Sequence, residues 1–212
     1  GDKSGAPSLR RSDAETLRIL DNVINIVLPS INPDGTQMVG DWYMKNVGTP
    51  YELSPLPKLY QEYVGHDNNR DGYMLNMIES RVMEHAWREW EPQIIHVHHQ
   101  TAPFPTRIWL PPFAEPIASR APYLLSRQVN MIGMAMAKGL EEKGQVGATH
   151  MGTGFDAWYP GYIDYMPMLQ NINAFWTETA LYRYATPHFY TLSDFPAGMR
   201  ARADDLPATL EA

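Results

Sequence analysis

The chain has 212 residues, of which 44% are hydrophobic and 19% are charged, so it carries enough apolar side chains for one packed domain. Lys and Arg number 17 against 24 Asp and Glu, and the net charge of −7 argues against nucleic acid or an anionic membrane surface as a partner. The absence of Cys excludes disulfides, a thiolate nucleophile and a cysteine-ligated zinc site, and no apolar run is long enough for a membrane span.

The beginning of the chain predicts a leader, a short helix and a strand. Residues 1–11 are polar and rich in Gly, Pro and Ser, so we expect a flexible leader. Ser12 followed by Glu15 forms a capping-box pattern, and the apolar spacing after it predicts a helix that ends soon after Leu20. The β-branched run VINIVL at 23–28 is typical of a buried strand.

Turn and loop signals dominate the next part of the chain. The sequence NPDG at 32–35 is a strong turn signal. Residues 38–64 are rich in aromatics, Gly and Pro, which predicts a long loop region with a short helix near 57–63. Apolar residues then recur at helical spacing, so we expect a helix over 71–89 that the following Pro92 ends.

The second half predicts two further strands and one long helix. The run QIIHVH at 93–98 and the run INAFWT at 172–177 are short, apolar and partly β-branched, which indicates strands. Six prolines between 101 and 122 argue against a helix or a central strand there. Residues 123–140 predict a Met-rich helix.

Helices that alternate with short apolar strands place the chain in the α/β class. No internal repeat or domain boundary is evident in the sequence. We therefore expect one domain over 12–200, followed by a poorly ordered acidic tail over 201–212.

Polar side chains gather where the predicted strands end, and sites in open α/β sheets form at the carboxyl ends of strands. His98 and His99 follow one strand, and a neutral imidazole there suits a zinc ligand. Glu178 ends another strand, and a carboxylate buried at that point is a candidate general base. The structural alternatives are a surface or hydrogen-bonded role for the histidine, and an ion pair of Glu178 with Arg183 or with a nearby helix.

The loop HDNNRD at 66–71 places a guanidinium beside an amide. Asn69 and Arg70 together offer the chemistry that grips a carboxylate. Asp67 and Asp71 flank Arg70, so a structural ion pair is an equal alternative from spacing alone.

Taken in order, four of these segments resemble the zinc carboxypeptidases of the M14 (funnelin) family. They are INPDG at 31–35, GHDNNRD at 65–71, PQIIHVHHQ at 92–100 and FWTETA at 175–180, and the resemblance spans about residues 13–187. It is closest to a bacterial branch that carries GHDNNRD. The resemblance implies a three-layer mixed sheet flanked by helices, of the phosphorylase/hydrolase-like kind, and an exported metallopeptidase that hydrolyses C-terminal peptide bonds.

The resemblance also implies a role for particular side chains. Asn69 and Arg70 would bind the terminal carboxylate of a peptide substrate. His99 would be a zinc ligand, with His98 as the second choice. Glu178 would activate a zinc-bound water molecule and move its proton.

A tyrosine lines the substrate site in that family, and here Tyr162 is the candidate, with Tyr159 and Tyr165 as alternatives. The Asp often found two residues before the ligand histidine is replaced by Val97 in this sequence. That replacement leaves the histidine without the carboxylate that usually orients it.

The family takes its other two zinc ligands from an H-x-x-E motif well upstream of NPDG, and the residues before Asn32 contain no His. We therefore expect the chain to lack the N-terminal elements of the domain, to bind zinc weakly and to be inactive alone. Surface exposed in this way would favour a homo-oligomer.

Three other functions stay open at this point. A non-catalytic member of the same fold would bind peptide carboxylates through Asn69 and Arg70 without zinc. A zinc-dependent deacylase would act on N-acyl amino acids instead of peptides. The abundance of Trp and Tyr would also suit a carbohydrate-binding surface.

Overall fold

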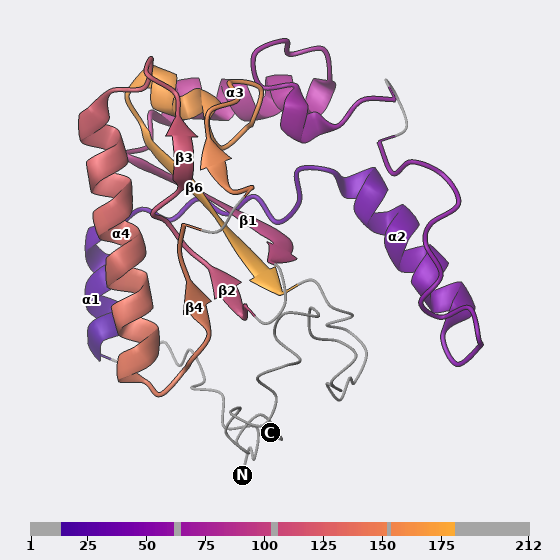
Figure 1. The fold of residues 1–212 in the computed structure, drawn as a ribbon. Coiled ribbons are helices and arrows are strands. Elements are labelled where there is room, and N and C mark those ends of the chain that lie inside the picture. The colour runs from indigo at the N-terminus through magenta and orange to yellow at the C-terminus, as the bar shows by residue number, and fades with distance from the viewer. Residues whose placement is uncertain (1–13, 62–64, 103–105, 152–153, 181–212) are drawn as a thin grey trace.

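The computed structural model describes residues 14–61, 65–102, 106–151 and 154–180. The helices are α1 (Ala14–Asn22), α2 (Pro33–Asn46), α3 (Ile78–Trp90) and α4 (Tyr123–Glu142), with two 3₁₀ segments, η1 (Asn68–Arg70) and η2 (Met166–Gln170). The strands are β1 (Ile94–Ala102), β2 (Ile108–Trp109), β3 (Ala114–Ile117), β4 (Ala148–Thr149), β5 (Asp156–Ala157) and β6 (Asn173–Ala180) (Figure 1). The predicted leader and tail lie outside the described residues.

The main sheet has the strand order β1-β6-β2-β4 and mixes strand directions. Strand β6 runs parallel to β1 and antiparallel to β2, and β2 runs parallel to β4. Strands β3 and β5 form a separate parallel pair. The predicted α/β class with a mixed sheet and helices is therefore confirmed. None of the described helices is long and apolar enough to cross a bilayer.

The main core lies between β6 and the helix α4. Leu125 and Val129 of α4 are buried against a cluster of aromatic side chains. In that cluster the rings of Phe113 and Trp176 have centroids 4.2 Å apart, and the rings of Trp109 and Trp176 are stacked at 5.9 Å. Apolar and aromatic burial of this kind is the main source of stability of such a domain.

The strongest periodic patterns give the elements that the sequence predicts. Helices α1, α3 and α4 and strands β1 and β6 all form, with ends shifted by a few residues. Helix α3 starts at Ile78 and not at 71, because residues 71–77 form a turn around a buried carboxylate. Both oxygens of Asp71 are used there: Oδ1 accepts from the amide of Asn76 at 3.2 Å and Oδ2 from that of Met77 at 2.9 Å.

The NPDG segment begins a helix and does not form the predicted turn. Pro33 occupies the start of α2, and the side chain of Asn32 accepts a hydrogen bond from the amide of Gly35 at 3.0 Å. Asn is a favoured N-cap and Pro a favoured first helical residue, so the same letters suit either structure. The loop predicted from residue 38 is therefore wrong up to Asn46, and no helix forms over 57–61, the described part of 57–63.

Two strand predictions also need correction. Residues 23–28 belong to no strand, and Ile24 is 83% exposed where the sequence predicts a buried position. The proline-rich stretch does contribute a central strand, because β2 lies between β6 and β4. It fits there because its two residues, Ile108 and Trp109, fall between the prolines.

Candidate functional site

The parallel pairing of β1 and β6 brings two of the predicted site residues side by side. His99 of β1 lies directly opposite Glu178 of β6 in the strand register. Both residues come near the carboxyl ends of their strands, where α/β sheets commonly form sites. Glu178 is 5% exposed and His99 is partly buried, so the two side chains share a largely desolvated edge of the sheet.

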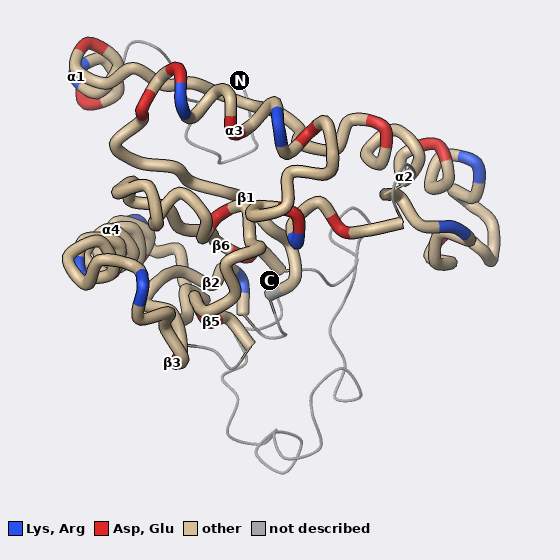
Figure 2. The backbone as a smooth tube through the Cα atoms, turned by 90° about the horizontal axis from the view of Figure 1, so that it is seen from above, with Lys and Arg blue, Asp and Glu red and all other residues tan. Residues whose placement is uncertain are grey.

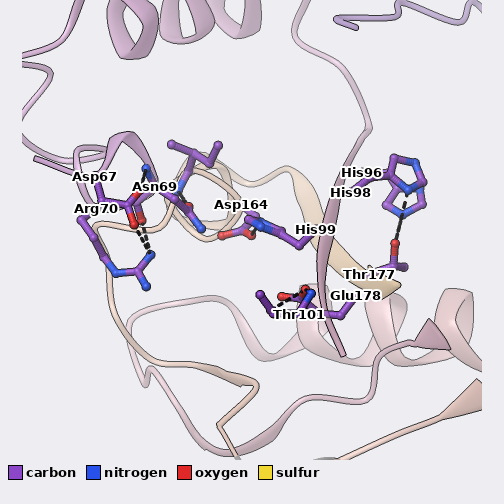
Figure 3. Close-up of polar contacts among 11 residues, drawn as sticks. Asp67, Asn69, Arg70, His96, His98, His99, Thr101, Asp164, Thr177 and Glu178 are labelled. Atoms are coloured by element: carbon purple, nitrogen blue, oxygen red, sulfur yellow. Dashed lines mark hydrogen bonds and ion pairs between the residues drawn. The ribbon is translucent and has the colours of Figure 1, made fainter. Parts of the chain in front are cut away.

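The imidazole of His99 is oriented by a carboxylate from a distant loop. Its Nε2 lies 3.0 Å from Oδ2 of Asp164, which is itself buried (Figure 3). Burial by itself lowers the pKa of His99, but the hydrogen bond and charge of Asp164, with the charge of Glu178, outweigh it and raise the pKa above its usual 6.5. The carboxylate expected two residues upstream is absent at Val97, and Asp164 takes its place from another element.

The carboxylate of Glu178 is held by the residue that follows the His-Gln pair. Its Oε2 accepts from the backbone amide of Thr101 at 2.7 Å and from the hydroxyl of Thr101 at 2.8 Å. Two donors on one oxygen fix the carboxyl group in place and leave Oε1 without a described hydrogen bond. The predicted ion-pair partner Arg183 lies outside the described residues.

The loop that carries Asn69 and Arg70 is attached to the loop that carries Asp164. Oδ1 of Asn69 accepts from the backbone amide of Ile163 at 3.0 Å, and the amide of Gly72 donates to the carbonyl of Gly161 at 2.9 Å. A Cβ on Gly72 would stand 2.9 Å from that same carbonyl oxygen, so the approach requires glycine. The two hydrogen bonds set the position of Arg70 relative to Asp164.

Arg70 lies over the ring of Tyr162, with its guanidinium carbon 4.7 Å from the ring centroid. Its Nη1 donates to the carbonyl of Asn69 at 2.8 Å, and the nearest carboxylate oxygen, Oδ2 of Asp67, is 3.9 Å away. Asp71 does not pair with Arg70, because its oxygens are bound to the amides before α3. The structural ion pair is thus a single long contact, and the half-exposed guanidinium retains donors for a ligand.

The three candidate tyrosines have different positions. Tyr162 contacts Arg70, and its ring meets that of Tyr159 edge-on at 5.2 Å. Tyr165 is buried in the core. Burial, with the charges of Asp156 and Asp164, raises the pKa of Tyr162 against the opposing effect of Arg70. Tyr162 is therefore the tyrosine that the structure brings to the site.

His96 and His98 point to a different side of β1 from His99. Nε2 of His96 lies 3.0 Å from the hydroxyl of Thr177, and Nδ1 of His98 lies 3.4 Å from it (Figure 3). Burial, with the neighbouring His98, lowers the pKa of His96 to about 4, so that ring is neutral at pH 7. His99, and not His98, is therefore the histidine whose imidazole lies near the carboxylate of Glu178.

The 67–70 loop, strand β1 and Glu178 of β6 line one groove of about 940 Å³. The loop that carries Tyr162 and Asp164 contacts two of the lining residues, Arg70 and His99. The polar end of the groove is formed by Asp67, Asn69, Arg70, His99, Thr101 and Glu178. The remainder of the groove runs between residues 24–31 and β1, and its lining combines apolar side chains of 24–31 and α3 with uncharged polar ones and with His96 and His98 of β1. A ligand in the polar end would meet the guanidinium of Arg70, the carboxylates of Asp67 and Glu178, and the imidazole of His99 that Asp164 orients.

His99 fits one ligand position of a zinc site, because Asp164 holds Nε2 and Nδ1 has no described hydrogen-bond partner. Within the described ranges, however, no group of three His, Cys, Asp or Glu side chains could hold a metal ion. Zinc sites in proteins take three or more protein ligands. The described residues therefore supply one ligand and not a complete zinc site.

Sequence reasoning placed His99, Glu178, Asn69, Arg70 and Tyr162 in the site, and the structure brings all five to one region. It missed Asp164, which lies in an irregular loop between β5 and η2. The only signal was a carboxylate two residues after a candidate tyrosine, and nothing local marks it as the partner of a histidine 65 positions away.

Searches of protein-family models, curated proteins and solved structures found no match to this chain.

Proposed function

We propose that this chain carries the carboxylate-binding and proton-transfer parts of a zinc metallocarboxypeptidase-like site, and that the chain is inactive alone. The observation that carries the proposal is that Arg70, His99 and Glu178 line the same groove although they come from three separate segments. The finer fold, a three-layer carboxypeptidase-like sheet, and an exported location belong to the same proposal.

Arg70 is suited to a terminal carboxylate because its guanidinium is partly exposed and planar, with several donors. Asn69 uses Oδ1 for the amide of Ile163, and its Nδ2 has no described acceptor, so that group remains to donate to the same carboxylate. A peptide held there by its C-terminus would place its last amide bond toward His99 and Glu178. Tyr162 would pack beside the terminal residue.

Glu178 is suited to proton transfer because one of its oxygens is fixed by Thr101 and the other is not engaged by a described residue. It would take a proton from the attacking water and pass it to the departing amine nitrogen. When bound, zinc would polarise the scissile carbonyl and lower the pKa of the water, with His99 as one of its ligands.

The test compares two otherwise identical peptides with apolar C-terminal residues, one a free acid and the other a C-terminal amide. Calorimetric titration should give measurable binding for the acid and binding about tenfold weaker or more for the amide, since a charge-assisted hydrogen bond is lost. Arg70→Gln should abolish that difference, and Arg127→Gln on α4, outside the groove, should retain it. Equal affinities for acid and amide in the unmodified protein would overturn the proposal.

A second candidate function is non-catalytic recognition of peptide carboxylates. It is favoured by the fact that the Arg70 half of the site is formed wholly by described residues. It predicts that peptide binding depends on Arg70 in the same way. It also predicts no zinc-dependent hydrolysis in any assembly, so Glu178→Gln would have no activity to change. The zinc carboxypeptidase proposal predicts that Glu178→Gln abolishes hydrolysis in any assembly that has a complete metal site.

A further inference from the structure

Strand β1 is an open edge of the main sheet. It pairs with β6 on one side, and no described strand pairs with its other side. The exposure of β1 agrees with this: most of β6 is buried, whereas Ile94 is 52% exposed and His98 and Gln100 are also exposed. A strand edge with unpaired backbone N–H and C=O groups is a template for another strand.

A second apolar segment faces this edge. Residues 23–28 have the composition of a strand, yet no described strand pairs with them. Their large apolar side chains are all exposed at about half of their surface or more: Val23, Ile24, Ile26, Val27 and Leu28. Figure 2 shows the layer containing this part of the chain beyond β1, on the side away from β6.

The groove of about 940 Å³ lies between these two segments. Residues 24–31 form one wall and Ile94–Thr101 the other, and side chains of α3, including Met83 and Trp87, add apolar surface. The charged lining residues, Asp67, Arg70 and Glu178, all lie in the polar end already described. Elsewhere the groove selects for an uncharged occupant.

We propose that this groove accepts one extended apolar strand of polypeptide, which pairs with the open edge of β1 and packs against residues 23–28. A polypeptide strand supplies alternating N–H and C=O groups to β1 and apolar side chains to both walls. A lipid or detergent tail fills apolar volume but leaves the backbone groups of the edge without partners. An edge-to-edge dimer through β1 would have to fit a whole second sheet, and not one strand, between β1 and residues 24–31.

This proposal does not depend on the proposed function. It does bear on the site, because the groove leads directly to His99 and Glu178. Residues at one end of a bound strand would therefore join the polar end and complete its surface. The strand would need roughly six to eight residues to follow β1 from Ile94 to the level of His99.

The test uses a fluorescein-labelled peptide of about eight residues with alternating Val and Thr, a Lys at each end and an amidated C-terminus. The amide prevents capture by Arg70. A matched peptide carries N-methyl groups at alternate residues and therefore cannot pair with a strand edge. Binding is followed by fluorescence polarisation, and hydrogen exchange of the β1 amides is measured with and without the peptide.

The unmodified peptide should bind and slow hydrogen exchange in β1, and the N-methylated peptide should not bind. Ile24→Lys and Val27→Lys, at exposed positions on the facing wall, should each weaken binding about tenfold. Met131→Lys, at a 72% exposed position of α4, should leave it unchanged. The proposal is overturned by no binding, by equal binding of both peptides, or by a protein that is already dimeric with protected β1 amides.

Discussion

Helix α4 contains two glycines whose replacement by alanine should change stability in opposite directions. At Gly133 a Cβ would lie 2.7 Å from the carbonyl carbon of Pro111 and 3.0 Å from its Cβ, and closer still to its carbonyl oxygen. At Gly139 nothing lies within 4 Å of the added atom. Both positions are inside the same helix, so intrinsic helix propensity affects them alike.

Alanine in a helix interior is favoured over glycine by about 1 kcal/mol. Gly139→Ala should therefore raise the free energy of unfolding by about that amount. At Gly133 the obstacle is backbone, so α4 has to move away from residues 111–113 and disturb the buried Leu125 and Val129. Overpacking of this kind costs about 1–3 kcal/mol, and the severity of this contact puts the net loss at about 2 kcal/mol.

Urea unfolding followed by tryptophan fluorescence measures both changes, because Trp109 and Trp176 belong to the core beside α4. We expect the midpoint to fall for Gly133→Ala and to rise for Gly139→Ala, with thermal midpoints displaced by roughly 4–8 °C and 2–4 °C respectively. If Gly133→Ala were as stable as the unmodified chain, the close packing of α4 on Pro111 would be refuted.

Three further predictions concern the site and its support. Asp164→Asn should lower the pKa of His99, and NMR of the His99 ring protons measures that change. The stabilisation from the raised pKa is present below about pH 6.5 and is lost as the pH rises through the folded-state pKa. The free energy of unfolding of the variant should therefore be lower by roughly 1.5–3 kcal/mol at about pH 5.5 and by less at about pH 8.5. A loss that does not depend on pH would contradict this. Asp71→Ala should cost about 3 kcal/mol in urea unfolding because two amides lose their acceptor, while the exposed Asp21→Ala should cost almost nothing, and equal losses would refute that role. Calorimetric titration with zinc should show only weak binding, and a sub-micromolar one-to-one site would refute the view that His99 is the one ligand supplied.

Much of the fold could be predicted because its main elements carry strong local patterns. The apolar spacing in α3 and α4 and the short apolar runs in β1 and β6 determine helix or strand without reference to the rest of the chain. Residues 23–28 show the limit of that reasoning. Their composition predicts a buried strand, but a strand also needs a neighbour to pair with, and no described strand provides one.

The NPDG segment shows a second limit. Asn, Pro, Asp and Gly are favoured in turns and at helix starts for the same local reasons: side-chain acceptors and a fixed proline φ. The next residues along the chain decide between the two, because residues 36–46 continue as helix with Trp42 and Tyr43 anchored to residues 52–54 by side-chain hydrogen bonds. Those contacts are tertiary and have no periodic signature.

The site could be predicted where strand ends marked it and not where a loop completed it. His99 and Glu178 follow apolar runs, and parallel pairing brings them together. Asp164 and Thr101 enter the site through the folding of irregular segments, so their roles depend on the tertiary structure. Asn69 was expected to bind substrate, and the structure adds a positioning contact with Ile163 that the loop sequence did not indicate.

The most direct measurement of the central claim is a crystal structure of the protein with a bound peptide that has a free C-terminus. We predict that the terminal carboxylate lies within hydrogen-bond distance of the Arg70 guanidinium and Nδ2 of Asn69, with the last amide carbonyl facing Glu178 and His99. A carboxylate bound elsewhere, with Arg70 and Glu178 both out of contact with the peptide, would contradict the claim.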